Sequence, residues 1–126
     1  MDLKEYFERT KGIAVLSTAD NEGKVDAAIY ARPHFLEDGQ IAFIMPDRLT
    51  HHNLQSNPYA VYLFVETQGL YQGKRLFIKK VSEEKNTERL QALRRRHLCN
   101  EDKEDDGKDR FLVIFTIEKE LPLIGS

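Results

Sequence analysis

The side chains best suited to chemistry in this sequence are two arginines and a short polar segment. Arg48 comes just before Thr50, His51 and Asn53, and Arg32 lies on an earlier extended run. Guanidinium groups donate hydrogen bonds in a fork that matches phosphate, and a helix start adds unpaired backbone N–H groups. These five residues therefore form a candidate anion site. The competing interpretation is that Thr50 only caps a short helix and that the arginines are solvated.

A metal site is the second chemistry that the residue types suggest, and their spacing argues against it. His51 and His52 are adjacent, so on a helix their side chains point about 100° apart and rarely share one ion. His97 and Cys99 lack the paired cysteines of a structural zinc site. We therefore expect no metal. With a single cysteine the chain cannot form an intramolecular disulfide, which fits a reducing compartment.

Catalysis by a side-chain nucleophile finds no support in the sequence. It contains no Gly-x-Ser-x-Gly, no Walker loop and no Gly-x-Gly-x-x-Gly. Cys99 lies beside the acidic run 101–106, where like charge would raise the pKa of a thiol. Tyr30 and His51 are the only candidates for a general acid or base, and we assign no catalytic residue. An enzymatic activity would therefore need a cofactor to supply the reactive group.

The composition is that of one ordinary globular domain. The 126 residues are 40% hydrophobic and 32% charged, with a formal net charge of −2. We expect a single domain over residues 1–126 and no nucleic-acid partner. The basic triplet Arg94–Arg96 precedes an acidic run, which favours a solvated face with local ion pairs. No signal peptide or membrane-spanning run is apparent, so we predict a cytoplasmic protein with no membrane contact.

Hydrophobic periodicity and turn residues predict a mainly β protein. Six extended runs follow one another through short turns: 13–18, 24–35, 41–45, 59–66, 74–81 and 110–118. The run 59–66 is almost continuously apolar, which is typical of a strand buried on both faces. Helices are predicted at 3–11, 50–56 and 82–98, the last capped by Ser82 or by Asn86 and Thr87. The short connections favour an antiparallel β-barrel with peripheral helices, with Pro33 at an edge or a bulge.

Three segments, taken in order, resemble a known family. The run 14–18 (Ala-Val-Leu-Ser-Thr) leads into the turn 20–23, Gly39 precedes the strand 41–44, and residues 53–58 read Asn-Leu-Gln-Ser-Asn-Pro. These segments resemble the first hairpin, the third strand and the Asn-Leu-x-x-Asn-Pro ending of the pyridoxamine 5′-phosphate oxidase-like family, the FMN-binding split barrels. The resemblance implies a six-stranded antiparallel split barrel. It also implies a homodimer that holds FMN in the clefts between its subunits.

The same resemblance implies cofactor-binding positions in this chain. They comprise a strand along the flavin ring, a pair near the ribityl chain, a phosphate-binding turn and a residue reaching in from the fifth strand. In that order they are Ile29, Tyr30, Ala31 and Arg32; Phe43 and Ile44; Arg48, Leu49, Thr50 and His51; and Gln72 or Arg75. Many relatives have a lysine or an arginine where this chain has Leu49 and Thr50.

The leading hypothesis is an FMN-binding protein that acts as a small flavin oxidoreductase or electron carrier. The alternative is a non-catalytic module on the same barrel. It would bind haem, through His34, His51 or His97, or another flavin-like ligand, or would serve protein interaction through Arg94–Arg96. A dimer is also expected from the residues: the apolar runs 59–65 and 111–117 exceed what one small core needs, and the apolar tail 121–124 can reach a partner.

Overall fold

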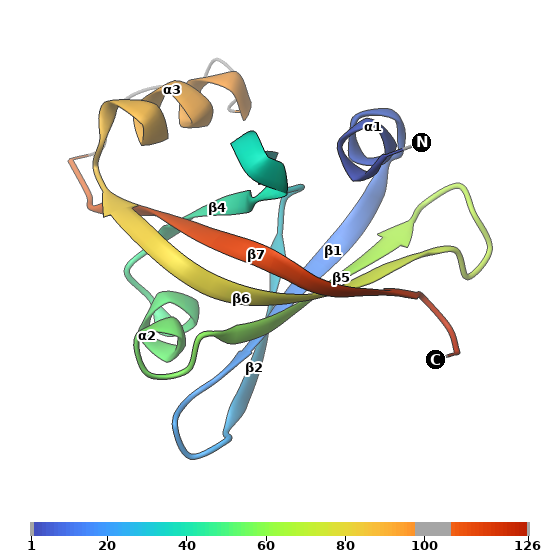
Figure 1. The fold of residues 1–126 in the computed structure, drawn as a ribbon, viewed down its shortest axis with the longest axis horizontal. Helices are drawn as coiled ribbons and strands as arrows, with labels where there is room; N and C mark the ends of the chain where they lie inside the picture. The colour runs from blue at the N-terminus through green and yellow to red at the C-terminus, as the bar shows by residue number, and fades with distance from the viewer. Residues whose placement is uncertain (1, 98–106, 126) are drawn as a thin grey trace.

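The computed structural model describes residues 2–97 and 107–125 (Figure 1). The predicted acidic loop falls largely outside this range, and so does Cys99. The strands are β1 (Gly12–Ala19), β2 (Val25–Tyr30), β3 (His34–Phe35), β4 (Ile41–Pro46), β5 (Tyr59–Glu66), β6 (Gly73–Lys85) and β7 (Arg110–Pro122). The helices are α1 (Leu3–Arg9), α2 (Leu49–Ser56) and α3 (Glu88–His97), with a short 3-10 turn at Glu37–Gly39. Among these described helices, none is long and apolar enough to cross a membrane.

The strands form one curled antiparallel sheet in the order β2-β1-β5-β6-β7-β4-β3. The two edge strands, β2 and β3, are consecutive in the chain and are joined by residues 31–33. We call this link the seam, because it connects the two edges of the curled sheet. The predicted class, a mainly β split barrel with peripheral helices, is confirmed.

The strand count is seven in the described residues, where the sequence predicted six. The predicted run 24–35 divides at the seam: Val25–Tyr30 pairs with β1, whereas His34 and Phe35 pair with β4. Pro33 has no backbone N–H to give to a ladder, and it is buried at the point where the run changes partners. The edge position expected from this proline is therefore correct. The predicted run supplies both edge strands of the sheet, β2 at one edge and β3 at the other.

The third helix starts later than predicted. Residues 82–85 continue β6, with Ser82 opposite Ile114 and Lys85 opposite Phe111. Asn86 turns the chain with a φ of 53°, and the side chain of Thr87 accepts a hydrogen bond from the Leu90 N–H at 3.2 Å. Of the caps considered from the sequence, Thr87 is thus the one used. Long-range pairing with β7 overrides the local helical preference of residues 82–85.

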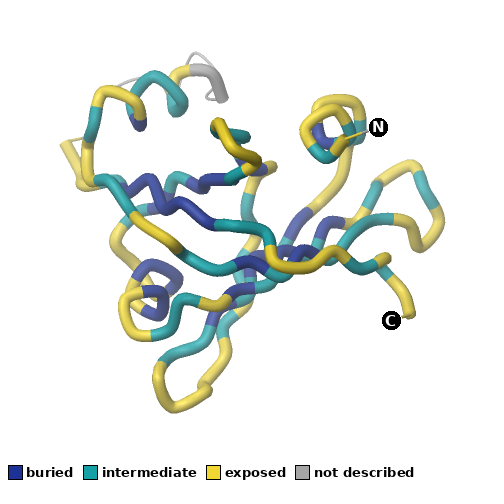
Figure 2. Tube along the Cα trace, in the orientation of Figure 1, coloured by how far each residue is buried: buried dark blue, intermediate teal, exposed yellow. Residues whose placement is uncertain are grey.

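The main core lies inside the curl of the sheet, where the trace is marked as buried (Figure 2). Many of its side chains are aromatic rings. α1 contributes Phe7, which packs edge-on against Phe64 and Tyr62 at centroid distances of 4.9 and 6.0 Å. Tyr62 and Phe64 are fully buried. Asp2 caps the seven-residue helix α1 by accepting a hydrogen bond from the Glu5 N–H, and this cap fixes where the helix begins. The helix then turns Phe7 toward the core.

A second cluster lies on the other face of β4 and β7, with Leu90 of α3 over Ala42, Leu112 and Ile114. These two strands, and not β5, are therefore the ones buried on both faces. β5 alternates instead, with buried residues inside and half-exposed ones such as Val61 outside. The prediction for the run 59–66 was wrong on this point because its outer face has no covering element in the described chain.

β1, β5 and β6 approach one another closely at two glycines. A Cβ on Gly73 would lie 1.9 Å from the carbonyl oxygen of Phe64, and one on Gly12 would lie 2.4 Å from that of Val65. Neither contact is possible between real atoms. The absence of a side chain therefore allows the ladders to run unbroken past Phe64.

Candidate functional site

A pocket of about 310 Å³ opens where the seam passes β4. We call it the seam pocket. Its lining combines the end of β2, the seam, β4 and residues from α3 and β7: Tyr30, Ala31, Arg32, His34, Phe43, Ile44, Arg94 and Arg110. Five of these were assigned to the cofactor from the sequence, and the fold brings them together from two segments.

One edge of β2 can form backbone hydrogen bonds to a ligand. β2 pairs only with β1, so its other edge has no strand partner in the sheet. At the end of the strand, the Tyr62 hydroxyl donates to the carbonyl oxygen of Ala31 at 3.0 Å and fixes the path of the seam. Burial raises the pKa of that Tyr62 hydroxyl. An edge strand fixed in this way can offer backbone hydrogen bonds to a flat ring.

Tyr30 connects the pocket to the start of α2. Its ring packs edge-on against Phe43 at 5.9 Å, and its hydroxyl is hydrogen-bonded to the side chain of Thr50. Burial raises the pKa of Tyr30, and the Thr50 hydrogen bond opposes that rise. Thr50 is buried next to Tyr30 and does not itself line the pocket. It is not the cap of α2, which begins at Leu49 with no side-chain cap at Arg48.

The charge of the seam pocket is positive. Arg32, Arg94 and Arg110 all line it, and none of the described lining residues is a carboxylate. Arg32 donates from Nη1 to the carbonyl oxygens of Phe7, at 2.7 Å, and Thr10, at 3.4 Å. These neutral partners leave its charge uncompensated. Three guanidinium groups around a small pocket are a donor set suited to phosphate.

Arg94 and Arg110 were not found by sequence reasoning. Arg94 was placed on a solvated face, but it is half-buried at the pocket. Arg110 opens β7, where its N–H donates to Asn86 Oδ1 at 2.9 Å. Both come from elements far along the chain from Tyr30, so no local spacing connects them with the site.

The rest of the predicted phosphate turn is arranged differently. Arg48 and Leu49 are exposed, and Arg48 is the only cation among residues 47–50. His51 is buried: Nδ1 lies 2.9 Å from Asp47 Oδ1, Nε2 lies 3.0 Å from Glu83 Oε2, and the ring stacks on Phe111 at 3.8 Å. Both ring nitrogens thus face carboxylate oxygens. The imidazole joins α2 to β6 and β7.

The remaining predicted residues do not line the seam pocket. Asn53 is buried and donates to Thr18 Oγ1 at 3.1 Å, which ties α2 to β1. Ile29 is 70% exposed on the outside of β2. Arg75 donates from Nε to the Pro122 carbonyl at 2.9 Å, and Gln72 lies in the exposed loop between β5 and β6. Within the described residues no group of three or more His, Cys, Asp and Glu side chains is placed to hold a metal ion.

Comparison with known proteins gives a likeness of structure only, because the sequence matches no protein-family model and no curated protein. An F420 reductase superposes with a TM-score of 0.75 at 12% identity, covering 96% of this chain and 98% of that one. An FMN-binding protein from Syntrophomonas wolfei gives 0.72 at 19%, with coverages of 95% and 82%.

A candidate pyridoxamine 5′-phosphate oxidase from Lactobacillus delbrueckii gives a TM-score of 0.69 at 10% identity, with coverages of 96% and 93%. In all three comparisons the match extends over nearly the whole of this chain. The chain therefore has the fold of the FMN-binding split barrels of the pyridoxamine 5′-phosphate oxidase-like proteins.

Proposed function

We propose that the protein binds FMN at the seam pocket and acts as a small flavin oxidoreductase or electron carrier. One observation carries the proposal: five residues assigned to the cofactor from the sequence line a single pocket, together with Arg94 and Arg110. The neighbours named for FMN and for pyridoxamine 5′-phosphate oxidase support the choice of a flavin.

The residues present fit such a group. The free edge of β2 and the ring of Tyr30 suit a flat heterocycle, and the guanidinium groups suit its phosphate. Arg94 and Arg110 supply the positive charge that the turn with Leu49 and Thr50 lacks. When bound, the flavin supplies the redox chemistry, and the chain's residues hold and orient it. A guanidinium close to the ring would also favour the reduced, anionic form.

The decisive measurement is a titration of the purified protein with FMN, followed by flavin fluorescence. We expect Arg94→Gln to weaken the affinity about tenfold, because a hydrogen-bonded charge pair is worth roughly 1.5–3 kcal/mol. Arg95→Gln is the matched control, since Arg95 is exposed one position further on the same helix and does not line the pocket. Failure to bind FMN, or equal losses in the two variants, would refute the proposal. The titration is repeated with F420, for which one neighbour is named.

A second candidate is a non-catalytic site for haem. His34 lines the seam pocket and is the one described histidine that does so. Visible absorption separates the two candidates, because flavin-loaded protein is yellow and haem-loaded protein is red-brown. Haem that binds to the purified protein but not to His34→Ala, with no FMN uptake by either, would favour this second function.

The proposed assembly is a homodimer with the flavin in the cleft between subunits. The seam pocket is at the small end of the range for ligand sites, so it encloses only part of an FMN. The outer face of the sheet carries an apolar groove of about 270 Å³ whose lining includes Val25, Tyr59, Val61 and Phe77. A second copy on this face would bury it.

The single cysteine, Cys99, suits a cytoplasmic setting.

A further inference from the structure

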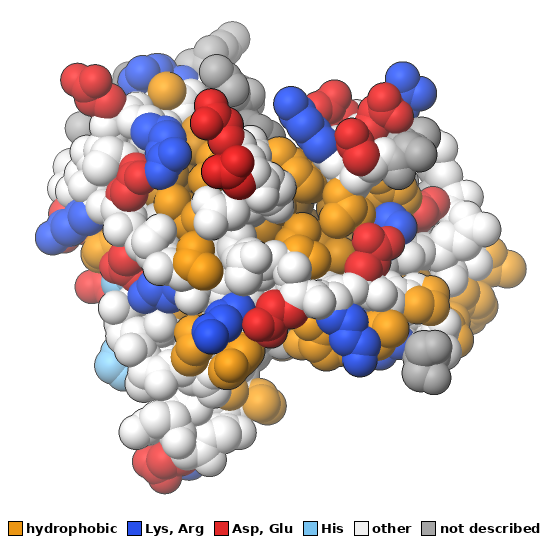
Figure 3. Space-filling model, viewed as in Figure 1, with side chains coloured by type: hydrophobic (Ala, Val, Ile, Leu, Met, Phe, Trp, Pro, Cys, Tyr) orange, Lys and Arg blue, Asp and Glu red, His pale blue; other side chains and the backbone are white. Residues whose placement is uncertain are grey.

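A second pocket lies between α1 and α3, on the other side of the seam. We call it the α1–α3 pocket. It has a volume of about 360 Å³ and is lined by Lys4, Phe7, Glu8, Arg32, Pro33, His34, Phe35 and Leu93. Figure 3 shows hydrophobic side chains exposed in the notch between the two helices, with charged groups around it. Arg32 and His34 also line the seam pocket, so the two pockets share a wall.

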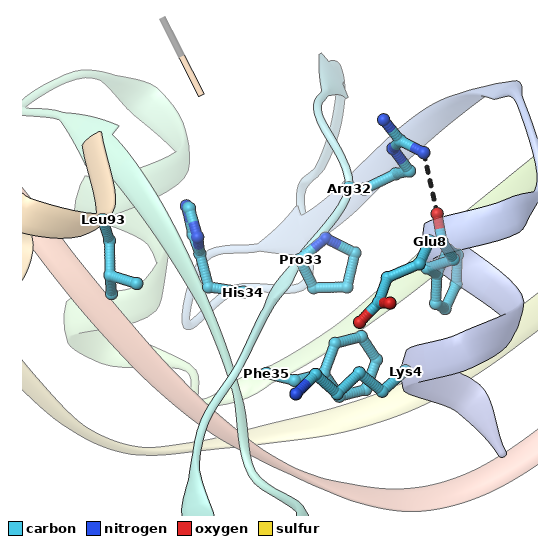
Figure 4. A pocket seen from close by; sticks show the side chains of 8 residues that line it. Lys4, Glu8, Arg32, Pro33, His34, Phe35 and Leu93 are labelled. Atoms are coloured by element: carbon cyan, nitrogen blue, oxygen red, sulfur yellow. Dashed lines mark hydrogen bonds between the residues drawn. The ribbon is translucent and has the colours of Figure 1, made fainter. Parts of the chain in front are cut away.

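The floor of the α1–α3 pocket is apolar and firmly packed. Phe7 and Pro33 are buried, and the rings of Phe7 and Phe35 are 6.0 Å apart. Leu93 of α3 closes the far side (Figure 4). An apolar ligand of one or two rings would fit the volume of this pocket. Its binding would remove these side chains from water, which is favourable.

The charged groups gather on the α1 side of the pocket. Figure 4 shows Arg32 and Lys4 on either side of the Glu8 carboxylate. The hydrogen-bond partners of Arg32 are the neutral carbonyl oxygens of Phe7 and Thr10, so they do not offset its charge. Among the described residues Lys4 and Glu8 form no ion pair, although they are one helical turn apart on α1. Two cations against one carboxylate leave a net positive charge next to an apolar floor.

The wall that carries these charges is held in place. Arg32 ties the carbonyl end of α1 to the seam, and the Tyr6 hydroxyl donates to Glu66 Oε2 at 2.5 Å. Phe7 anchors the same helix in the core. Because α1 and the apolar floor are in place before binding, the exposed side chains of Lys4 and Glu8 are the groups on this helix that must order when a ligand arrives.

We propose that the α1–α3 pocket binds a small carboxylic acid with an apolar, ring-sized body. The carboxylate would lie near Lys4 and Arg32, and the body would rest on Phe7, Pro33, Phe35 and Leu93. This proposal does not rest on the proposed flavin function and needs no bound flavin, although Arg32 and His34 line both pockets. Because the wall is shared, an acid bound here lies beside the seam pocket.

The test uses the purified protein without added FMN and follows amide shifts by nuclear magnetic resonance. The probe is 2-naphthoate, and its neutral counterpart 2-naphthamide has the same rings and no charge. We expect naphthoate to shift the backbone amide signals of residues 4–8, 34, 35 and 93. We expect 2-naphthamide to bind at least about threefold more weakly. Equal affinities, or shifts confined to other parts of the chain, would overturn the proposal.

Two exposed residues on one helix give opposite predictions. Lys4→Gln should weaken naphthoate binding about threefold, because it removes an attractive charge. Glu8→Gln should strengthen it by about the same factor, because it removes a repelling one. Lys24→Gln, on the exposed β1–β2 turn, is the control and should change nothing. If Glu8→Gln bound naphthoate more weakly than the parent protein, the proposal would be overturned in favour of a zwitterionic or cationic ligand. FMN binding is measured separately, so either site can fail alone.

Discussion

His51 and Glu83 show how single side chains fix the start of α2. Glu83 accepts from Gln55 Nε2 at 3.0 Å and pairs with Lys80 Nζ at 2.8 Å, while its other oxygen faces His51. Burial opposes ionisation of Glu83, but the hydrogen bonds from Gln55, Lys80 and His51 outweigh it and lower its pKa to about 2. The carboxylate is thus a structural anion that positions α2 against β6.

The low pKa of Glu83 predicts a loss of stability in acid. Its pKa is depressed from 4.5 in the unfolded chain to about 2 in the fold, so its contribution is complete above pH 4.5 and lost as the pH falls toward 2. Thermal unfolding between pH 7 and pH 2.5 checks this. Glu83→Gln should be less stable at pH 7, and its melting temperature should fall less steeply below pH 4.5. Parallel curves for the two proteins would contradict the assignment.

At the residue scale, the sequence predicted the site where neighbours in the chain make it. Tyr30, Ala31 and Arg32 follow one another, as do Phe43 and Ile44, and an extended run keeps such residues together. The other half of the site depends on tertiary pairing. Arg110 meets the pocket because β7 pairs with β4, and nothing near it in the sequence indicates that partner.

At the scale of elements, turns were predicted better than partners. Gly and Asp lie beside the starts of several strands, so the predicted starts are close to the observed ones, whereas the predicted ends at 81 and 118 fall short of Lys85 and Pro122. The helix predicted from residue 82 failed because the pairing of β6 with β7 extends to Lys85. Local propensity could not weigh that ladder against the helix, since the partner strand lies beyond the helix itself.

The close approach of β5 and β6 predicts a sharp response at Gly73. We expect Gly73→Ala to destabilise the fold by about 1–3 kcal/mol, because the new methyl group meets the Phe64 carbonyl and the strands must separate. Chemical denaturation measures the loss of unfolding free energy. Gln72→Ala, on the neighbouring exposed residue, should stay within about 0.5 kcal/mol of the parent. A neutral Gly73→Ala would show that the ladder relaxes there without cost.

At the scale of the whole molecule, the proposed dimer predicts a mass of twice 14.7 kDa in solution. Light scattering after size exclusion measures it. Tyr59→Lys should shift the protein toward monomer, because it places a charge on the outer face where Tyr59 is 54% exposed. His52→Lys adds a charge on the exposed side of α2 and serves as the control. A parent protein that is monomeric at micromolar concentration would refute the dimer.

The position of β7 between β6 and β4 also sets the order of assembly during synthesis. β4 is made early, yet Ile41 and Met45 have their ladder partners at Phe115 and Phe111. Strands β1, β2, β5 and β6 can pair as soon as they leave the ribosome, and so can β3 with β4. Among the described strands, the β3–β4 pair joins the rest of the sheet only through β7. Such distant pairing is slow to form. The seam and the two pockets beside it are therefore completed only after β7 has been made and has paired with β4.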